Sequence, residues 1–250
     1  MAFRPIVIIP VYNHPDTVGY MVDGVLRAAL PCLLVDDGSE ASCAAVLDVL
    51  AAKHPEVQVL RLSLNQGKGA AVMSGMRQAF DQGYSHGLQI DADGQHAIED
   101  IPAFIALARL HPQAMVCGAP VYDASVPKGR LYGRYLTHIW VWINTLSLDI
   151  RDSMCGFRVY PLAEAIATLN SANIGKRMDF DTEVLVRMHW RGVRFMVQPT
   201  AVTYPRDGLS HFQVWRDNVQ ISGMHARLFA GMLLRSPWLL GRKLMRVLQA

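Results

Sequence analysis

The chain has 250 residues, 51% of them hydrophobic and 18% charged, with a formal net charge of +3. This length accommodates one large α/β domain with a sizeable core and a small appendage. It contains no run of ~20 apolar residues, so we expect no membrane-spanning helix, and the mild charge does not support nucleic-acid binding. We expect no signal peptide, and the four cysteines form no CxxC pair, which favours reduced thiols in the cytoplasm.

Apolar runs alternate with segments of helical spacing through the first half of the chain. The first run, rich in β-branched residues and stopped by proline, is typical of a central parallel strand. Strands are expected at 5–13, 33–35, 57–62, 88–90 and 115–118, and helices at 16–30, 41–52, 67–80 and 101–110. This alternation predicts an α/β fold with a mainly parallel, twisted sheet flanked by helices and joined by right-handed crossovers.

Two of the expected strands end in paired carboxylates. Asp36 and Asp37 follow the second strand, and Asp91 and Asp93 follow the fourth. Ligands of open α/β sheets bind beyond the carboxyl ends of the strands, and close carboxylates suit Mg²⁺ or Mn²⁺ bound together with phosphates and water. A surface turn is the alternative for each pair, because aspartate favours turns. The repeated ending favours a ligand site at this edge of the sheet.

The loop at 65–70, Asn-Gln-Gly-Lys-Gly-Ala, opens the third expected helix. Backbone N–H groups at a helix N-terminus bind anions, but the GxxxxGK spacing of a P-loop is absent. The loop is therefore either a phosphate-facing element or a tight turn.

The second half of the chain is less regular. The basic residues of 128–134 lead into an aromatic stretch at 139–143, which is typical of an interfacial helix and equally compatible with a core helix that has a solvated basic end. Residues 152–160 are expected to be a loop that enters a strand. Asp181 heads an apolar helix as its N-cap, as a catalytic group or as both, and Glu183 suits the first turn of that helix.

The tail at 211–250 is basic and amphipathic. Apolar or small residues recur at helical spacing, no acidic residue follows Asp217, and five basic residues do. Such a segment is typical of helices that lie on an anionic membrane surface. The alternative is a helix pair that packs on its own domain or on a second subunit of a homodimer.

Five motifs occur in an order and spacing found in one family. They are Val-Ile-Ile-Pro-Val-Tyr-Asn at 7–13, Val-Asp-Asp-Gly-Ser at 35–39, Asn-Gln-Gly-Lys-Gly at 65–69, Asp-Ala-Asp-Gly-Gln-His at 91–96 and Cys-Gly-Phe-Arg at 155–158. From about residue 5 to residue 210, the chain resembles the family-2 glycosyltransferases with the GT-A fold. It is similar to their dolichyl- and polyprenyl-phosphate sugar transferase branch and to bacterial members of lipid and aryl-polyene clusters. Cys155 stands where many relatives have serine or threonine, and the paired C-terminal membrane spans of some relatives are missing.

This resemblance implies roles for particular residues. A UDP- or GDP-linked nucleotide sugar would be bound by Pro10, Val11, Tyr12, Asn13, Asp36, Asp37, Gly67, Lys68, Asp91 and Ala92. Mg²⁺ or Mn²⁺ would be held on the diphosphate by Asp91, Asp93 and Gln95, and would neutralise the charge of the departing nucleotide. Phosphate groups would be gripped by Arg158, Arg206, Ser210 and His211.

The implied reaction is a single inverting displacement that moves the sugar to a polyprenyl phosphate, a lipid hydroxyl or another amphiphilic acceptor. For a hydroxyl acceptor, Asp181 would be the catalytic base, with Glu183 as second choice, whereas an ionised phosphate needs no base. The implied organisation is a GT-A domain at 1–210 and a tail at 211–250 that anchors the enzyme to the inner face of the cytoplasmic membrane.

Two other classes of protein are weighed against this one. A nucleotidyltransferase on a related scaffold would need a glycine- and arginine-rich loop after the first strand, and residues 10–13 do not provide it. A nucleotide-sugar-binding scaffold subunit without turnover is the second class. The intact Asp91, Asp93 and Gln95 weigh against it.

Overall fold

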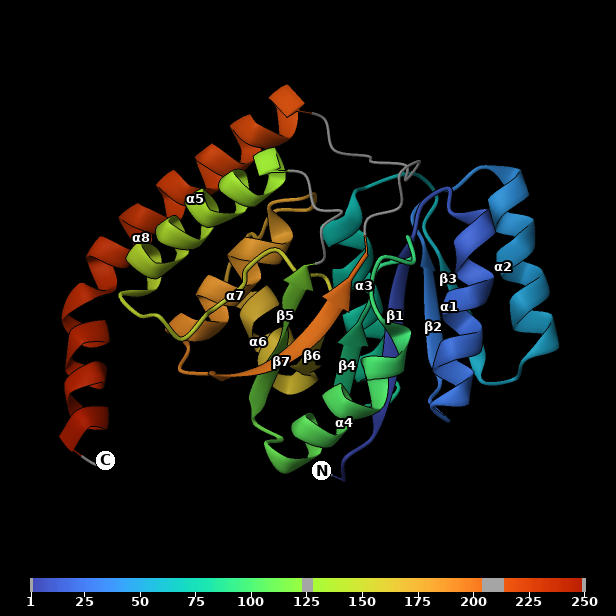
Figure 1. The fold of residues 1–250 in the computed structure, drawn as a ribbon, viewed down its shortest axis with the longest axis horizontal. Coiled ribbons are helices and arrows are strands. Elements are labelled where there is room, and N and C mark those ends of the chain that lie inside the picture. The colour runs from blue at the N-terminus through green and yellow to red at the C-terminus, as the bar shows by residue number, and fades with distance from the viewer. Residues whose placement is uncertain (1, 123–127, 204–213, 249–250) are drawn as a thin grey trace.

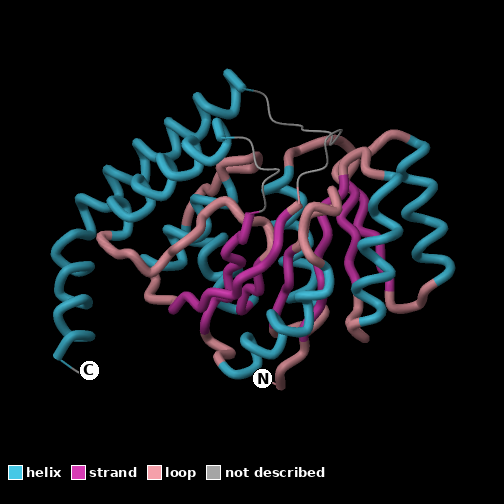
Figure 2. The backbone as a smooth tube through the Cα atoms, viewed as in Figure 1, coloured by secondary structure: helices cyan, strands magenta, loops and turns pink. Residues whose placement is uncertain are grey.

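A seven-stranded sheet forms the centre of the described structure (Figure 1, Figure 2). The computed structural model describes residues 2–122, 128–203 and 214–248. Its strands are β1 (Pro5–Val11), β2 (Cys32–Asp36), β3 (Val57–Arg61), β4 (His86–Gln89), β5 (Ala114–Tyr122), β6 (Arg158–Pro161) and β7 (Arg194–Val202). Their order is β3-β2-β1-β4-β6-β5-β7, and only β6 runs against its neighbours. The mainly parallel sheet predicted from the sequence is confirmed.

Helices cover both faces of this sheet (Figure 1). They are α1 (Pro15–Arg27), α2 (Ala41–Lys53), α3 (Lys68–Asp81), α4 (Ile101–Leu110), α5 (Lys128–Thr145), α6 (Leu162–Ser171), α7 (Phe180–Trp190) and α8 (Val214–Leu248), with a 3₁₀ turn, η1 (Ile98–Asp100), before α4. Helices α1, α2 and α4 pack on one face, and α3, α6 and α7 pack on the other.

Alternate residues of β1 supply two separate hydrophobic cores. Ile6 and Ile8 belong to the core on the α3 side, whereas Val7 and Ile9 belong to the core on the α1 side, and all four are fully buried. Successive side chains of a strand point to opposite faces, so a strand covered on both faces is apolar at every position. This double burial explains the unbroken apolar run at the start of the chain.

The reversed strand β6 positions part of the site. The chain passes through α5 at the carboxyl end of the sheet (Figure 1) and then enters β6 from that end, so β6 runs antiparallel to β4 and β5. The register places Arg158, the first residue of β6, opposite Gln89, the last residue of β4. Two polar side chains are thereby paired at the edge where the sequence predicts a ligand site.

Helices α5 and α8 pack side by side outside the sheet (Figure 1), with the rings of Trp140 and Phe229 in edge contact at 6.2 Å. The described tail is one helix of 35 residues, not the helix pair weighed from the sequence. Pro237 lies inside α8, and the helix changes direction in its C-terminal part, because proline removes a backbone hydrogen bond. Within the described ranges, none of the helices combines the length and the hydropathy that a membrane span requires.

Candidate active site

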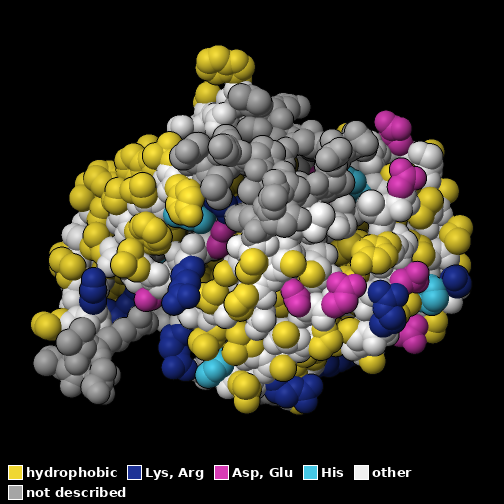
Figure 3. All heavy atoms as spheres, in the orientation of Figure 1, with side chains coloured by type: hydrophobic (Ala, Val, Ile, Leu, Met, Phe, Trp, Pro, Cys, Tyr) yellow, Lys and Arg dark blue, Asp and Glu magenta, His cyan; other side chains and the backbone are white. Residues whose placement is uncertain are grey.

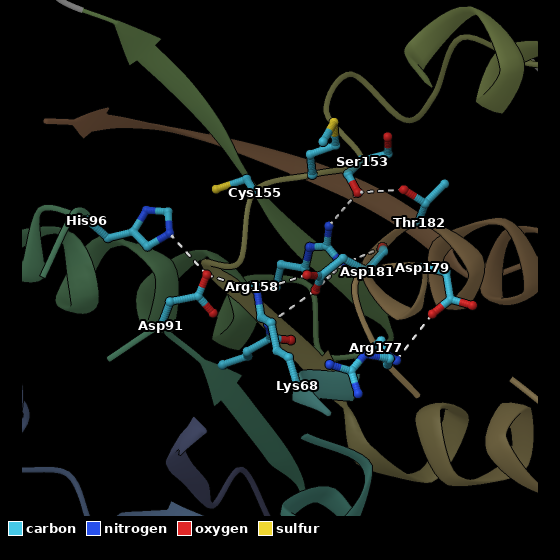
Figure 4. A network of polar contacts seen from close by, with 12 residues as sticks. Lys68, Asp91, His96, Ser153, Cys155, Arg158, Arg177, Asp179, Asp181 and Thr182 are labelled. Carbon is cyan, nitrogen blue, oxygen red and sulfur yellow. Dashed lines mark hydrogen bonds and ion pairs between the residues drawn. The ribbon is translucent and has the colours of Figure 1, made fainter. Parts of the chain in front are cut away.

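One lysine joins two carboxylates at the carboxyl edge of the sheet. Lys68 is the first residue of α3, Asp91 follows β4, and Asp181 lies in the first turn of α7. The Lys68 Nζ lies 2.9 Å from Asp91 Oδ2 and 2.8 Å from Asp181 Oδ2, and Figure 4 shows the three side chains turned toward one another. Three distant parts of the chain thus form one charged cluster, at the edge where open α/β sheets bind ligands.

The groups of this cluster stabilise one another in their charged forms. Burial lowers the pKa of Lys68, but the carboxylates of Asp181 and Asp91 outweigh burial and raise this pKa overall. Burial raises the pKa of Asp91, and the opposing effects of Lys68 and His96 bring it below its ordinary value. The His96 Nε2 lies 4.0 Å from Asp91 Oδ2, and burial lowers the pKa of His96.

The residues after Asp91 form a tight turn that suits a divalent cation. The Asp93 Oδ1 accepts a hydrogen bond from the Gln95 N–H at 3.0 Å, and burial together with Asp91 raises the pKa of Asp93. The Asp91 Oδ1 is buried and accepts no hydrogen bond within the described residues. Two adjacent carboxylates of this kind fit a cation that takes its other ligands from phosphate and water. No group of three or more His, Cys, Asp or Glu side chains in the described ranges would enclose a metal by itself.

A buried polar network holds Asp181. Arg158 is fully buried and donates to the carbonyl oxygens of Asp181 at 2.7 Å and Ser153 at 2.9 Å. The Gln89 side-chain amide donates to Asp181 Oδ1 at 3.3 Å, and the Tyr160 hydroxyl donates to Gln89 Oε1 at 3.0 Å. These hydrogen bonds fix the orientation of the Asp181 carboxylate.

The second candidate base, Glu183, contacts other partners. Its buried carboxylate accepts hydrogen bonds from Arg187 at 2.6 Å and from the Gly175 N–H at 3.0 Å, and it lies 3.6 Å from Arg227 of α8. Two residues apart on a helix, Asp181 and Glu183 face different directions. Asp181 lies in the charged cluster, whereas Glu183 joins α7 to α8 and to the loop before α7.

The paired aspartates after β2 organise the neighbouring loops. The Asp36 carboxylate accepts hydrogen bonds from the Ser39 N–H and from Arg61, each at 2.9 Å. The Asp37 carboxylate accepts hydrogen bonds from the N–H groups of the two residues before Lys68, at 2.8 and 2.9 Å. Burial raises the pKa of Asp37. The loop after β2 is therefore tied to the loop that opens α3.

The predicted donor residues at 10–13 end β1 at the same edge. Asn13, whose φ is 56°, donates from its N–H to Ser39 Oγ at 3.1 Å. Nearby, the Thr17 hydroxyl donates to the Ala92 carbonyl oxygen at 2.5 Å. Hydrogen bonds thus join the loop after β1 to the loop after β2, and the start of α1 to the loop after β4.

Two glycines allow close backbone approach at the cluster. A Cβ atom at Gly156 would collide with the Asp91 carboxylate, which explains the glycine in the Cys-Gly-Phe-Arg motif. Gly67 has a φ of 103°, and Lys176 and Arg177 pack against it. A side chain at either glycine would displace a segment that carries a candidate site residue.

Sequence reasoning missed Gln89, Tyr160 and Ser153. The signal for Gln89 was an amide inside an otherwise apolar strand. The signal for Tyr160 was its spacing from Arg158, which puts the two side chains on one side of a strand. Gln89 and Tyr160 are fully buried, and the hydrogen bond between them is buried as well. Arg206, Ser210 and His211 lie outside the described residues.

The fold is shared with solved glycosyltransferases. The mannosyltransferase PcManGT from Pyrobaculum calidifontis, solved with GDP-Man and Mn²⁺, matches with a TM-score of 0.61 over 94% of this chain and 69% of that chain, at 17% identity. Glucosyl-3-phosphoglycerate synthase from Mycobacterium tuberculosis matches with a TM-score of 0.61 over 94% and 80%, at 14% identity. The fold is therefore GT-A, as predicted.

The chain belongs to glycosyl transferase family 2, whose sequence model matches residues 6–165. It is 28% identical over 206 residues to undecaprenyl-phosphate mannosyltransferase of Micrococcus luteus, covering 78% of this chain and 82% of that protein. It is 31% identical over 175 residues to polyprenol monophosphomannose synthase of Mycolicibacterium smegmatis, covering 63% and 61%. It is 30% identical over 202 residues to dolichyl-phosphate beta-glucosyltransferase of Mus musculus, covering 72% and 61%. The match thus spans about 61% of the length of the last two relatives.

Proposed function

We propose that the protein transfers a sugar, with inversion, from a nucleotide-diphosphate sugar to a lipid-linked or amphiphilic acceptor at a membrane surface. The observation that carries this proposal is the cluster in which Lys68 joins Asp91 to Asp181. It brings the predicted donor residues and the predicted base to one edge of the sheet. The names of the three relatives above refer to undecaprenyl phosphate, polyprenol monophosphomannose and dolichyl phosphate, which supports a phosphorylated lipid as acceptor.

The donor end of the site is formed by Asp91, Asp93 and Gln95. Asp91, with one oxygen without a partner in the described structure, and Asp93 would hold Mg²⁺ or Mn²⁺. When bound, the ion would neutralise charge on the departing nucleotide. Lys68 occupies the second oxygen of Asp91 and adds a further positive charge where a diphosphate would lie.

Asp181 is the proposed base when the acceptor is a hydroxyl. Gln89 and Arg158 fix its carboxylate, and Lys68 lies 2.8 Å from its Oδ2, so the carboxylate is positioned to accept the proton as the acceptor attacks. With an ionised phosphate as acceptor, no proton is transferred and no base is needed. In both cases Arg158 acts through Asp181, because its guanidinium is fully buried.

We propose a catalytic unit at 1–210 and a tail at 211–250 that lies on the inner face of the cytoplasmic membrane. The surface formed by α5 and α8 carries exposed apolar side chains (Figure 3), namely Tyr135, Leu136, Ile139, Leu233, Leu234, Trp238, Leu240 and Leu244. An apolar cavity of about 340 Å³ beside Trp142 and Leu148 is bordered by Lys243. Apolar and basic side chains together favour an anionic lipid surface.

The test is a transfer assay with radiolabelled UDP-glucose or GDP-mannose, Mn²⁺, and vesicles that contain polyprenyl phosphate. We expect label to pass into the lipid fraction from one donor, and Asp181→Asn to separate the two acceptor classes. Loss of at least 100-fold in rate with a lipid hydroxyl, and little loss with polyprenyl phosphate, is expected from the base role. Nucleotide binding without transfer to any lipid acceptor would instead support the scaffold class.

A further inference from the structure

A polar cavity of about 400 Å³ lies between α8, the loop before α7 and the loop before α3. It is lined by Asn65, Gln66, Lys176, Arg177, Asp179, Arg216, Gln220 and Arg227. Four of these side chains are cationic and one is acidic, so the lining carries an excess of positive charge. The volume corresponds to roughly a dozen water molecules at ~30 Å³ each, which is room for a phosphate and the first atoms of its substituent.

Carboxylates around this cavity neutralise only part of its positive charge. Arg227 lies 3.6 Å from Glu183 and Arg177 interacts electrostatically with Asp37, whereas Lys176 and Arg216 form no ion pair within the described residues. The one acidic side chain, Asp179, accepts a hydrogen bond from the N–H of Arg177 at 3.2 Å and so belongs to the loop itself (Figure 4). Cationic side chains that outnumber the carboxylates around them are suited to an anion, and guanidinium groups to phosphate in particular.

The cavity adjoins the charged cluster along two chain segments. Gln66 is two residues from Lys68, and Asp179 is two residues from Asp181. Two residues span at most about 7 Å between Cα atoms, so a phosphate held in the cavity lies next to the groups proposed for transfer.

Helix α8 gives this cavity an amphiphilic border. Arg216, Gln220 and Arg227 recur at spacings of four and seven, which places them on one helical face, and the contact of Arg227 with Glu183 turns that face toward α7. On neighbouring faces, Trp215 and Val219 are 87% and 68% exposed. A ligand with a phosphate and an apolar chain would match both parts of this border.

We propose that this cavity binds the phosphate group of a lipid. The phosphate belongs either to the acceptor or to a bulk anionic lipid of the membrane. Assignment to the acceptor rests on the proposed function, and the affinity of the cavity for a lipid phosphate does not.

The test compares the double variant Lys176→Gln/Arg216→Gln with the control Lys53→Gln/Arg27→Gln, which removes the same two charges from exposed positions on α2 and α1. Lys176 and Arg216 are also exposed, so both double variants are expected to fold, as thermal unfolding will verify. Binding is measured by sedimentation with vesicles of phosphatidylcholine alone, with added polyprenyl phosphate, and with phosphatidylglycerol at equal charge.

We expect the cavity variant to bind polyprenyl phosphate vesicles about tenfold more weakly than the wild type, and the control to change less than twofold. A loss confined to polyprenyl phosphate vesicles identifies the acceptor as the source, and an equal loss with phosphatidylglycerol identifies the bulk lipid. Equal binding by the cavity variant and the control would overturn the proposal. Nucleotide binding is titrated on the same samples, so a wild type that binds lipid phosphate but no nucleotide would refute the proposed function alone.

Discussion

At the scale of single residues, the candidate base depends on groups that never touch solvent. Tyr160, Gln89 and Arg158 are all fully buried and connect to Asp181 by hydrogen bonds and a 3.5 Å ion pair. A buried polar group that loses its partner costs about 1–3 kcal/mol. Changes to this network should therefore alter both the stability of the fold and the orientation of the base.

Tyr160→Phe removes one hydroxyl from the network and keeps the ring. We expect kcat to fall about tenfold, which corresponds to about 1.4 kcal/mol, while the KM for the nucleotide sugar changes less than twofold. The rate is measured with a hydroxyl acceptor, for which the base is needed. Tyr84→Phe, at a buried tyrosine against Arg4, is the matched control. Equal kcat values in the two variants would remove Tyr160 from the positioning role.

Asp93→Ala tests the metal assignment at the other end of the cluster. Removal of one of two carboxylates should abolish the part of nucleotide binding that depends on Mn²⁺, a loss of at least tenfold in affinity. Binding to the same nucleotide in the presence of chelator should not change. The assignment is wrong if the variant retains the full metal effect.

Only some of these site residues could be predicted from the sequence. Asp91 and Asp181 were predicted as site residues because carboxylates at element ends are visible in one sequence. Gln89 and Tyr160 were not, because their roles come from pairing across β4 and β6, and the two lie 71 positions apart. Strand register of this kind follows from the tertiary fold and is weakly encoded in local composition.

At the scale of elements, periodicity predicted the strands and helices of the first half to within a few residues. Strand β1 is buried on both faces of the sheet, so its unbroken apolar run indicates a central strand without ambiguity. The second half was harder, because β6 reverses direction and α6 and β7 follow with weaker patterns. Met224, Leu228 and Met232 of α8 are buried in the core of the domain, while other apolar residues of α8 are exposed, so the sequence of α8 alone does not distinguish membrane contact from packing.

The contact between α5 and α8 should weaken as the pH falls. His225 of α8 is buried beside Trp140 and Asn144 of α5, and burial lowers its pKa from 6.5 to about 4. The unfolded chain then takes up a proton at higher pH than the folded protein, so stability is lost as the pH falls from 6.5 to 4.

The measurement is the free energy of unfolding of the wild type and of His225→Phe at several pH values. The difference between the two free energies of unfolding should be constant above pH 7. Between pH 7 and pH 4, the wild type should lose about 3 kcal/mol of stability relative to the variant. Other titrating groups cancel in this difference. A difference independent of pH would show that His225 does not titrate in this way.

At the scale of the whole molecule, exposed apolar side chains are concentrated on one end. In Figure 3 they gather over α5 and α8, at the opposite end from α2. Contiguous apolar surface of this kind marks an interaction site. Orientation of this end toward lipid would bring the cation-lined cavity and the charged cluster near the membrane.

Leu234→Glu tests this orientation. Leu234 is 84% exposed on α8, so the change should leave the fold intact and weaken binding to phosphatidylglycerol vesicles about tenfold, through lost apolar contact and added negative charge. Val49→Glu makes a comparable change at a 65% exposed residue of α2. If both variants bind vesicles equally well, the α5 and α8 surface is not the one that meets the membrane.

The most direct test of the central claim is calorimetric titration of the protein with UDP and with GDP, each with Mn²⁺ and with chelator. The proposed site predicts micromolar binding of one nucleotide that requires the metal, because Asp91 and Asp93 bind the diphosphate through the cation. The nucleotide that binds would also identify which nucleotide sugar to use as donor in the transfer assay. Failure of both nucleotides to bind a folded sample with Mn²⁺ present would contradict the assignment of this cluster as a nucleotide-sugar site.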